Sequence, residues 1–286
     1  MSDIAKQVLA QYEKNKAASG GQNKFTNQED RMKKYFTTIL PKGVSSAEKR
    51  IRILPSKDDS LLFKEVKFHE IQVDGDWTKL YDPAQDGNRS PLNEVKEALE
   101  ATGKDADLEL SKSYRSRKFY IVKLIDRDKE LDGPKFWRFK HNSKGDGVMD
   151  KIAPIFRTKG DITDPIDGRD LILTLTLSKS NNGKDYTSIS SVIPDDKAPL
   201  HTDPAKAKEW LDDELVWSDV YAKRSEDYLD MVANGEVPQW DKENKKYVSK
   251  TSGEVTVGGT PTAHAEEPVI ADPQAEVEEP DDNLPF

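Results

Sequence analysis

A leucine segment with strict alternation limits the fold of this chain more than any other feature. Every second residue of 171–177 is leucine, and the residues between them are Ile or Thr. A period of two places the leucines on one face of a β-strand. Asn182-Gly183, a dipeptide typical of tight hairpin turns, separates Leu171–Lys179 from a second strand-like run, Asp185–Ile193. The chain is therefore expected to build an antiparallel sheet with one buried face.

Turn dipeptides also separate most of the other predicted strands. Asp74-Gly75 lies between two such strands, and Asp132-Gly133 lies at the end of a longer loop between two more. The other predicted strands are Arg50–Leu54, Lys64–Val73, Asp76–Tyr81, Phe119–Ile125 and Lys135–Lys140. Seven short strands joined by tight turns predict a small antiparallel barrel or sandwich rather than a parallel sheet.

Helical patterns surround these strands. The predicted helices are Asp3–Asn15, Asn93–Ala101, Val148–Phe156 with an interruption at Pro154, a helix from Pro204 to about Val216, and Arg224–Ala233. In the first of them Ile4, Val8 and Tyr12 recur every four residues and form one apolar stripe. The fold class is therefore expected to be mainly β with peripheral helices (α+β).

The net charge of −9 is distributed unevenly along the chain. Residues 31–160 hold 28 basic and 21 acidic side chains, a net charge of +7. Residues 161–250 hold 12 basic and 19 acidic side chains, and residues 251–286 hold nine acidic side chains and no Lys or Arg. A basic first half followed by an acidic end indicates contact with nucleic acid in a chain that also has an acidic tail.

The segment 251–286 is dominated by Pro, Gly, Thr and Glu, so it is expected to be disordered. Its last six residues are acidic and then apolar, a pattern that suits capture by an apolar pocket with a basic rim. The residues expected to bind such a partner are Asp281, Asp282, Leu284, Pro285 and Phe286. The alternative is a tail that serves only solubility.

Basic and aromatic residues are interleaved most densely in residues 111–140. This stretch holds ten Lys and Arg side chains, and its four acids fall in the predicted loop. Its aromatic residues are Tyr114, Phe119, Tyr120, Phe136, Trp137 and Phe139. Proteins that bind single-stranded nucleic acid use cations to contact the phosphates and aromatic rings to stack on the bases. The alternative is that all six rings fill the core and the charges form a solvated rim. Alternation along Phe119–Ile125 and Lys135–Lys140 indicates that at least one ring per strand belongs to the core.

Other chemistry has little support in the sequence. The chain has no cysteine, no phosphate-binding Gly-Lys-Ser/Thr loop and no Gly-x-Ser-x-Gly elbow, and its four histidines are scattered. We therefore expect no enzymatic activity, no metal and no cofactor. No apolar run approaches the roughly 18 residues of a membrane span, so no membrane partner is expected.

Several segments, in this order, resemble the single-stranded DNA-binding (helix-destabilising) proteins of T-even-like tailed bacteriophages. They are Arg50–Asp59, which contains Ile-Arg-Ile-Leu-Pro-Ser-Lys, then Lys112–Asp126, Phe136–Phe139, Met149–Ile152 and Val192–Asp196. The resemblance covers roughly residues 1–235. It implies an oligonucleotide-binding (OB) fold with a basic cleft lined by aromatic residues, and an N-terminal segment that makes binding cooperative. It also implies an acidic tail that recruits replication and recombination proteins and competes with DNA.

The chain departs from this family at two places. Founding members carry a zinc subdomain with one histidine and three cysteines, whereas here His69 is followed by no cysteine. We expect Tyr81–Leu110 to replace that subdomain by packing, without zinc. The end of the tail, Asp281–Phe286, is more similar to the terminal peptide of bacterial single-stranded DNA-binding proteins.

The sequence thus predicts a cooperative, sequence-nonspecific protein that binds single-stranded DNA without catalysis. By the resemblance it acts in replication, recombination and repair in the cytoplasm of an infected bacterial host. Three parts are expected: a self-association segment at 1–22 that binds neighbouring protomers through Ile4, Val8 and Tyr12, a binding core at 23–250, and the tail. The expected DNA contacts are Arg52, Lys57, Tyr114, Arg115, Arg117, Lys118, Tyr120, Lys123, Phe136, Trp137, Arg138 and Lys140.

Three questions stay open. A β-barrel adaptor whose basic face binds an acidic protein is the main alternative function. A nuclease is a weaker alternative, because no cluster of acids accompanies the basic strands. The sequence also leaves the choice between DNA and RNA open, since both offer phosphates and bases that stack.

Overall fold

Antiparallel strands make up most of the fold, and several helices pack around them. The computed structural model describes residues 28–57, 61–143, 145–179, 185–241, 243–250 and 255–256. The strands are β1 (Ser46–Ile53), β2 (Lys64–Val73), β3 (Asp76–Tyr81), β4 (Arg117–Asp126), β5 (Lys135–Lys140), β6 (Arg169–Lys179), β7 (Asp185–Lys197), β8 (Pro238–Asp241), β9 (Lys246–Ser249) and β10 (Val255–Thr256). The α-helices are α2 (Gln28–Met32), α3 (Pro91–Ala101), α4 (Asp105–Ser111), α5 (Val148–Lys159), α6 (Pro204–Asp212), α7 (Trp217–Val220) and α8 (Glu226–Ala233). Short 3₁₀ turns are η1 (Pro83–Asp86), η2 (Lys112–Tyr114) and η3 (Arg127–Asp132).

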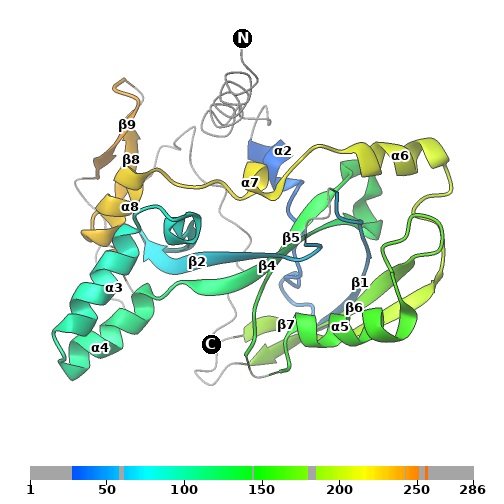
Figure 1. The fold of residues 1–286 in the computed structure, drawn as a ribbon, viewed down its shortest axis with the longest axis horizontal. Helices are drawn as coiled ribbons and strands as arrows, with labels where there is room; N and C mark the ends of the chain where they lie inside the picture. The colour runs from blue at the N-terminus through cyan, green and yellow to red at the C-terminus, as the bar shows by residue number, and fades with distance from the viewer. Residues whose placement is uncertain are drawn as a thin grey trace, which may run out of the picture.

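Strand β4 is the centre of an eight-stranded antiparallel sheet with the main order β10-β2-β4-β1-β6-β7. One edge of β4 pairs with β5, and the other edge pairs first with β2 and then with β1. Figure 1 shows the consequence: β1, β5, β6, β7 and α5 gather at one end of the molecule, and α3, α4 and α8 gather at the other. The strands β2 and β4 connect the two ends. Among the described strands, β7 pairs only with β6, so the sheet does not close into the predicted barrel.

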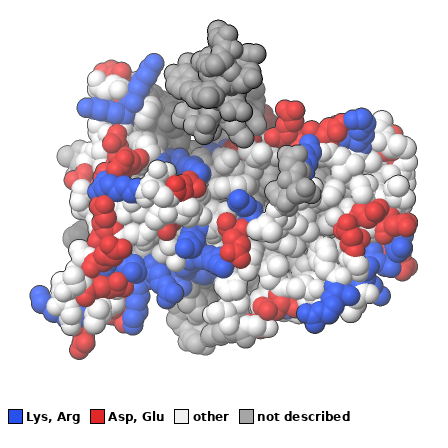
Figure 2. Space-filling view, viewed as in Figure 1, with Lys and Arg blue, Asp and Glu red and all other residues white. Residues whose placement is uncertain are grey.

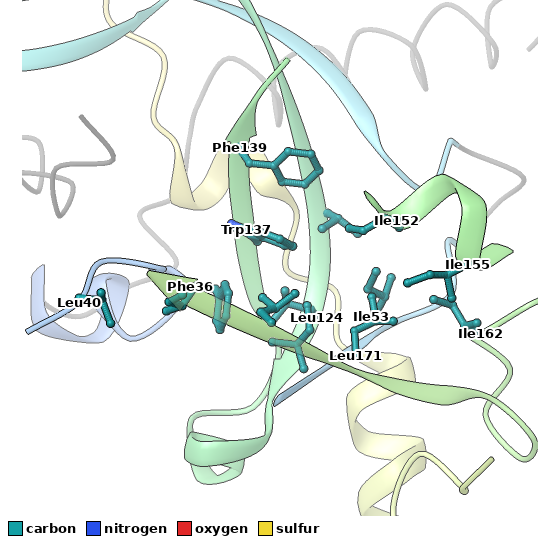
Figure 3. Packing of buried hydrophobic residues seen from close by; sticks show 14 residues of the cluster. Phe36, Leu40, Ile53, Leu124, Trp137, Phe139, Ile152, Ile155, Ile162 and Leu171 are labelled. Atoms are coloured by element: carbon teal, nitrogen blue, oxygen red, sulfur yellow. The ribbon is translucent and has the colours of Figure 1, made fainter. Parts of the chain in front are cut away.

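The main apolar core lies at the end formed by β1, β4, β5, β6 and α5. Alternate residues of these strands point into it, among them Ile53, Leu124, Trp137 and Leu171. Figure 3 shows the isoleucines of α5 and the ring of Phe36 closing this cluster from outside the sheet. Leu171, Leu173 and Leu175 of β6 all point into this core. The alternation of leucines in the sequence therefore identified the buried face of this strand correctly.

A second apolar cluster holds α3 and α8 against the far ends of β2 and β3. It contains Ile71, Leu80, Leu92 and Tyr228, with Leu99 partly buried beside them. Helix α3 belongs to Tyr81–Leu110, the segment expected to replace a zinc subdomain. This helix packs into an apolar cluster. His69 lies fully buried near it, with Nδ1 2.7 Å from the carbonyl oxygen of Tyr114.

The hairpins and most helices lie where the sequence placed them. Strands β2, β3 and β5 have the predicted bounds, and β4, β6 and β7 are longer by a few residues. The interruption predicted at Pro154 is wrong, because α5 continues to Lys159. The buried side chains of Ile152 and Ile155 hold this helix on the core, and we attribute its continuity to them, since a proline in a helix costs about 3 kcal/mol. Helix α4 and the hairpin β8–β9 were not predicted.

Helix α6 ends at Asp212 instead of about Val216, and the reason is tertiary. Its last fully buried anchor is Trp210, and the backbone of Asp213 is extended. The ammonium of Lys123 donates to the carbonyl oxygens of Asp213 and Leu215, which holds the chain in this extended form. No local sequence pattern reports such a contact.

The burial of Trp137 leads to a prediction about stability. This side chain is 1% exposed, so Trp137→Ala should lower the free energy of unfolding by about 3–5 kcal/mol. Urea denaturation measures the change, and Trp77→Ala is the control because Trp77 is 40% exposed. The control should stay within about 0.5 kcal/mol of wild type. An equal, small effect of both substitutions would contradict the described core.

Candidate nucleic-acid interface

Five of the twelve residues predicted to contact DNA are buried. They are Arg52, Tyr114, Phe136, Trp137 and Arg138, with exposed fractions from 0% to 7%. Tyr114, Phe136 and Trp137 each belong to an apolar cluster. Burial in this conformation argues against direct DNA contact by these five side chains. Phe136, Trp137 and Arg138 lie on β5, which is covered on both faces, whereas Arg52 is buried on β1 and Tyr114 in η2. The alternative that rings of this stretch fill the core holds for Tyr114, Phe136 and Trp137.

Arg52 binds backbone and carboxylate groups in place of phosphates. Its guanidinium donates to the carbonyl oxygens of Asp164 and Ala198 at 2.8 and 2.9 Å, and lies 3.3 Å from a carboxylate oxygen of Asp170. Gly168 packs so closely that an added Cβ would lie 2.5 Å from Arg52 Nη2. The arginine thus fastens the loop between α5 and β6 to β1.

Arg138 lies between three aromatic rings. The centre of its guanidinium is 4.8 Å from the ring centroid of Phe68, 5.5 Å from that of Phe119 and 4.7 Å from that of Tyr221. Cation–π attraction is strongest where water is excluded, and Arg138 is only 3% exposed. The residue therefore joins β2, β4 and β5 to the chain that follows α7.

Lys57 and Lys123 both contact Asp213. Lys123 Nζ lies 2.5 Å from a carboxylate oxygen of Asp213 and donates to two carbonyl oxygens, while Lys57 Nζ donates to the Asp213 carbonyl at 3.2 Å. Burial lowers the pKa of Lys123, and the ion pair with Asp213 opposes that shift. These two lysines position the segment that leads into α7.

Arg117 and Lys140 share Glu70. Their nitrogens lie 3.1 and 2.6 Å from the same carboxylate oxygen. Burial lowers the pKa of Lys140 to about 8, and the nearby Glu70 limits that shift. Glu70 thus joins β2 to the start of β4 and to the end of β5.

Lys118, Arg115 and Tyr120 reach the surface. Lys118 Nζ lies 2.9 Å from Glu65, and the hydrogen bond that the lysine donates to this carboxylate raises the pKa of the lysine. Arg115 is exposed in the turn before β4. Tyr120 is half-buried, with its ring centroid 5.6 Å from that of Phe139. Of the predicted stacking residues, only Tyr120 offers part of its ring to solvent.

A pocket of about 420 Å³ lies along the edge of β2 that β3 leaves unpaired. Its lining combines cationic, aromatic and acidic side chains: Lys64, Glu65, Val66, Lys67, Tyr81, Gln85, Asp86, Lys118, Trp217 and Lys223. Four lysines face two carboxylates here, so the pocket is net positive. Figure 2 shows Lys and Arg side chains gathered over β2 and the neighbouring part of β4.

Tyr81, Asp86, Trp217 and Lys223 form a connected group inside this pocket. The rings of Tyr81 and Trp217 are stacked, with centroids 5.9 Å apart and planes 27° from parallel. Lys223 Nζ lies 4.1 Å from the Tyr81 ring centroid and donates to Asp86 at 2.7 Å. Burial raises the pKa of Tyr81 and so does its hydrogen bond to Asp86, so the tyrosine stays protonated at neutral pH.

A buried acid–histidine pair supports η1, whose residues Gln85 and Asp86 line one side of the pocket. His69 Nε2 faces Asp82 Oδ1 at 3.5 Å, and Asp82 caps η1 by accepting from the backbone of Ala84. Burial alone would raise the pKa of Asp82, but its interaction with His69 and hydrogen bonds from Ser116 and Ser90 hold it well below the usual range. The turn η1 then presents Gln85 and Asp86 to the pocket. In the described part of the chain, no three His, Asp or Glu side chains are grouped to hold a metal ion.

The other wall depends on α7, whose two ends are anchored. Lys123 holds the segment before it, and Val220 at its end accepts hydrogen bonds from Arg31 and from the hydroxyl of Tyr35. Between these anchors Trp217 lies half-buried against Tyr81. Local patterns did not predict Trp217 and Lys223, because they lie 77 and 83 residues after the end of the basic stretch at 111–140. The Trp-x₅-Lys spacing on its own predicts nothing.

The remaining predicted residues lie outside the described part of the chain. These are the self-association residues Ile4, Val8 and Tyr12 and the partner-binding residues Asp281, Asp282, Leu284, Pro285 and Phe286.

Comparison of the sequence with protein-family models gave no match, and comparison with curated proteins gave none. No helix within the described ranges is both long and apolar enough to cross a lipid bilayer. The arrangement of residues in the pocket therefore carries the functional argument.

Proposed function

We propose that the chain binds single-stranded DNA without sequence preference, and that the pocket between β2 and α7 holds one of the bases. The observation that carries this proposal is the half-buried ring of Trp217, which is stacked on the buried Tyr81 and lies among four lysines. Binding of single-stranded nucleic acid requires at least an aromatic ring on which a base stacks and cations that contact the phosphates. Such binding does not depend on the base sequence, because every base can stack.

The ion pairs of the pocket are compatible with exchange for phosphate. Lys118 is 38% exposed beside Glu65, and Lys223 is 43% exposed beside Asp86. Surface pairs of this kind contribute about 0–1 kcal/mol, so a phosphate can replace the carboxylate at small cost. Lys64 and Lys67 are exposed, and each adds a further positive charge at the pocket.

The resemblance seen in the sequence extends this proposal. In it, the open antiparallel sheet is a variant of the OB fold, residues 1–22 bind the neighbouring protomer, and the acidic tail recruits replication and recombination proteins. The same proposal places the protein in DNA replication, recombination and repair of a phage-infected bacterium.

Substitution of Trp217 tests the proposal. Trp217→Leu removes the stacking surface, and loss of one stacked base costs about 1–3 kcal/mol. The dissociation constant for labelled oligo-dT, measured by fluorescence anisotropy at low salt, should rise about 5- to 150-fold. Trp77→Leu is the matched control, because Trp77 is an exposed ring on β3 outside the pocket.

Three results would count against the proposal. Unchanged binding by Trp217→Leu would exclude the pocket, and equal affinity for duplex DNA would exclude a single-strand preference. Binding of an acidic protein without any binding of oligo-dT or oligo-rU would favour the adaptor. A comparison of the two oligomers also decides between DNA and RNA.

Deletion of residues 257–286, which leaves β10 in place, tests the proposed competition by the tail. The eight acidic side chains of this segment would mimic phosphates, so their removal should tighten oligo-dT binding and change its salt dependence. Equal affinity of the full chain and the truncated chain would remove this competition from the proposal.

A further inference from the structure

The pocket borders a short part of β2 whose outer edge is not covered by another strand. On one side, residues 64–68 of β2 pair with β4, whereas on the other side the pairing with β3 begins only at Phe68, opposite Tyr81. Residues two positions apart in an antiparallel strand direct their backbone N–H and C=O groups to the same edge. The backbone groups of alternate residues before Phe68 are therefore directed to the edge that borders the pocket.

Gln85 closes this edge at Lys67. The backbone N–H of Lys67 donates to Gln85 Oε1 at 2.9 Å, and Gln85 Nε2 donates to the carbonyl oxygen of Lys67 at 2.9 Å. The backbone N–H of Asp82 donates to the same carbonyl oxygen at 3.0 Å. The side-chain amide of Gln85 thus takes the place of a neighbouring strand. This edge accepts a planar group that has one donor and one acceptor side by side.

Glu65 is the next residue whose backbone is directed to this edge, because it lies two positions before Lys67. No residue in the described part of the chain forms a hydrogen bond with the backbone N–H or C=O of Glu65. The carboxylate of Glu65 is engaged separately, 2.9 Å from Lys118 Nζ. Glu65 lines the same pocket as Trp217. An open donor–acceptor pair of the backbone therefore lies at the pocket that holds the stacking ring.

This open pair fits a nucleobase better than an added peptide strand. A peptide that extends a sheet pairs with several alternate residues in turn, but Gln85 already occupies the position next to Glu65, at Lys67. A nucleobase needs only one such pair, because a donor and an acceptor lie side by side on its Watson–Crick edge. Trp217 offers the surface on which that base stacks, and the exposed Lys64 and Lys67 flank Glu65 along the strand.

From this geometry we infer that the base stacked on Trp217 is bound through its Watson–Crick edge by the backbone N–H and C=O of Glu65. For thymine, the N–H of ring position 3 donates to the carbonyl oxygen of Glu65, and a ring carbonyl accepts from the backbone N–H. The inference rests on the proposed function, because it assigns the hydrogen bonds of the same pocket. In duplex DNA these groups of the base are already paired, so this pocket selects unpaired bases.

Modified oligonucleotides test the inference on the wild-type chain. Binding of (dT)12 is compared by fluorescence anisotropy with that of an oligomer of 3-methylthymidine, which keeps the ring and the phosphates but has a methyl group in place of the N–H. An oligomer of deoxyuridine is the control, since it lacks the 5-methyl group and keeps the Watson–Crick edge. Methylation at position 3 should weaken binding about 2- to 12-fold through the loss of one hydrogen bond, and the deoxyuridine oligomer should bind like (dT)12.

The variant Trp217→Leu locates the effect. Without the stacking ring the base no longer lies in the pocket, so methylation at position 3 should change the affinity of this variant less than about twofold. An equal effect of methylation on wild type and on Trp217→Leu would place the Watson–Crick contact outside the pocket and overturn the inference. If methylation leaves wild-type binding unchanged while Trp217→Leu weakens (dT)12, the inference fails and the proposed function stands. If Trp217→Leu binds (dT)12 like wild type, the proposed function fails.

A proline at position 65 tests the backbone N–H itself. Proline has no N–H and is tolerated at the open edge of a sheet, so Glu65→Pro removes the donor without removing a hydrogen bond to β4. Glu65→Ala is the reference, because both substitutions remove the carboxylate, and urea denaturation checks that each variant is folded. Glu65→Pro should bind (dT)12 about 2- to 12-fold more weakly than Glu65→Ala. Equal affinity of the two folded variants would contradict the inference, and the comparison of oligonucleotides on wild type decides it if Glu65→Pro does not fold.

Discussion

The burial of β4 on both faces is the constraint on which the rest of the structure depends. Phe119 and Ile121 point into one apolar cluster, and Val122 and Leu124 point into another on the opposite side of the sheet. Both edges of β4 are also paired, so its backbone hydrogen bonds lie almost entirely within the sheet. At roughly 25 cal/mol per Å² of apolar surface removed from water, these clusters account for much of the fold's stability. Side chains that could bind a ligand are therefore found near the start of β4 and along the part of β2 that β3 leaves unpaired.

The cations of the basic stretch divide into two groups for the same reason. Those in the middle of β4 and β5 hold other parts of the chain: Arg138 binds three rings, and Lys123 binds the segment before α7. Those near the start of β4, such as Lys118, remain at the surface. The internal group still serves the candidate interface indirectly, because Lys123 positions α7 and with it Trp217. An arrangement of this kind separates the residues that build a site from those that touch the ligand.

The sequence predicted the seven main strands of the sheet, but neither the hairpin β8–β9 nor the site. Alternation at Leu171–Leu177 and the turn at Asp74-Gly75 gave the hairpins, because side-chain period and turn chemistry are local properties. Local patterns could not show that Trp137 is buried and Tyr120 is half-buried, since both lie in strands that mix aromatic, aliphatic and basic residues. Nor could local patterns predict that Trp217 contacts Tyr81, which lies 136 positions earlier in the chain. That contact depends on the anchoring of α7 by Arg31, Tyr35 and Lys123, which are themselves distant in sequence.

Hydrogen exchange with mass spectrometry tests the central claim most directly, because it reports on the whole described chain without a substitution. The free protein is compared with the protein saturated with (dT)12 at low salt. The account predicts slower amide exchange in residues 64–67, around Lys118 and in residues 217–223, with little change in β6 and β7. Unchanged exchange in these three segments, or slower exchange confined to β6 and β7, would contradict a nucleic-acid interface at the pocket between β2 and α7.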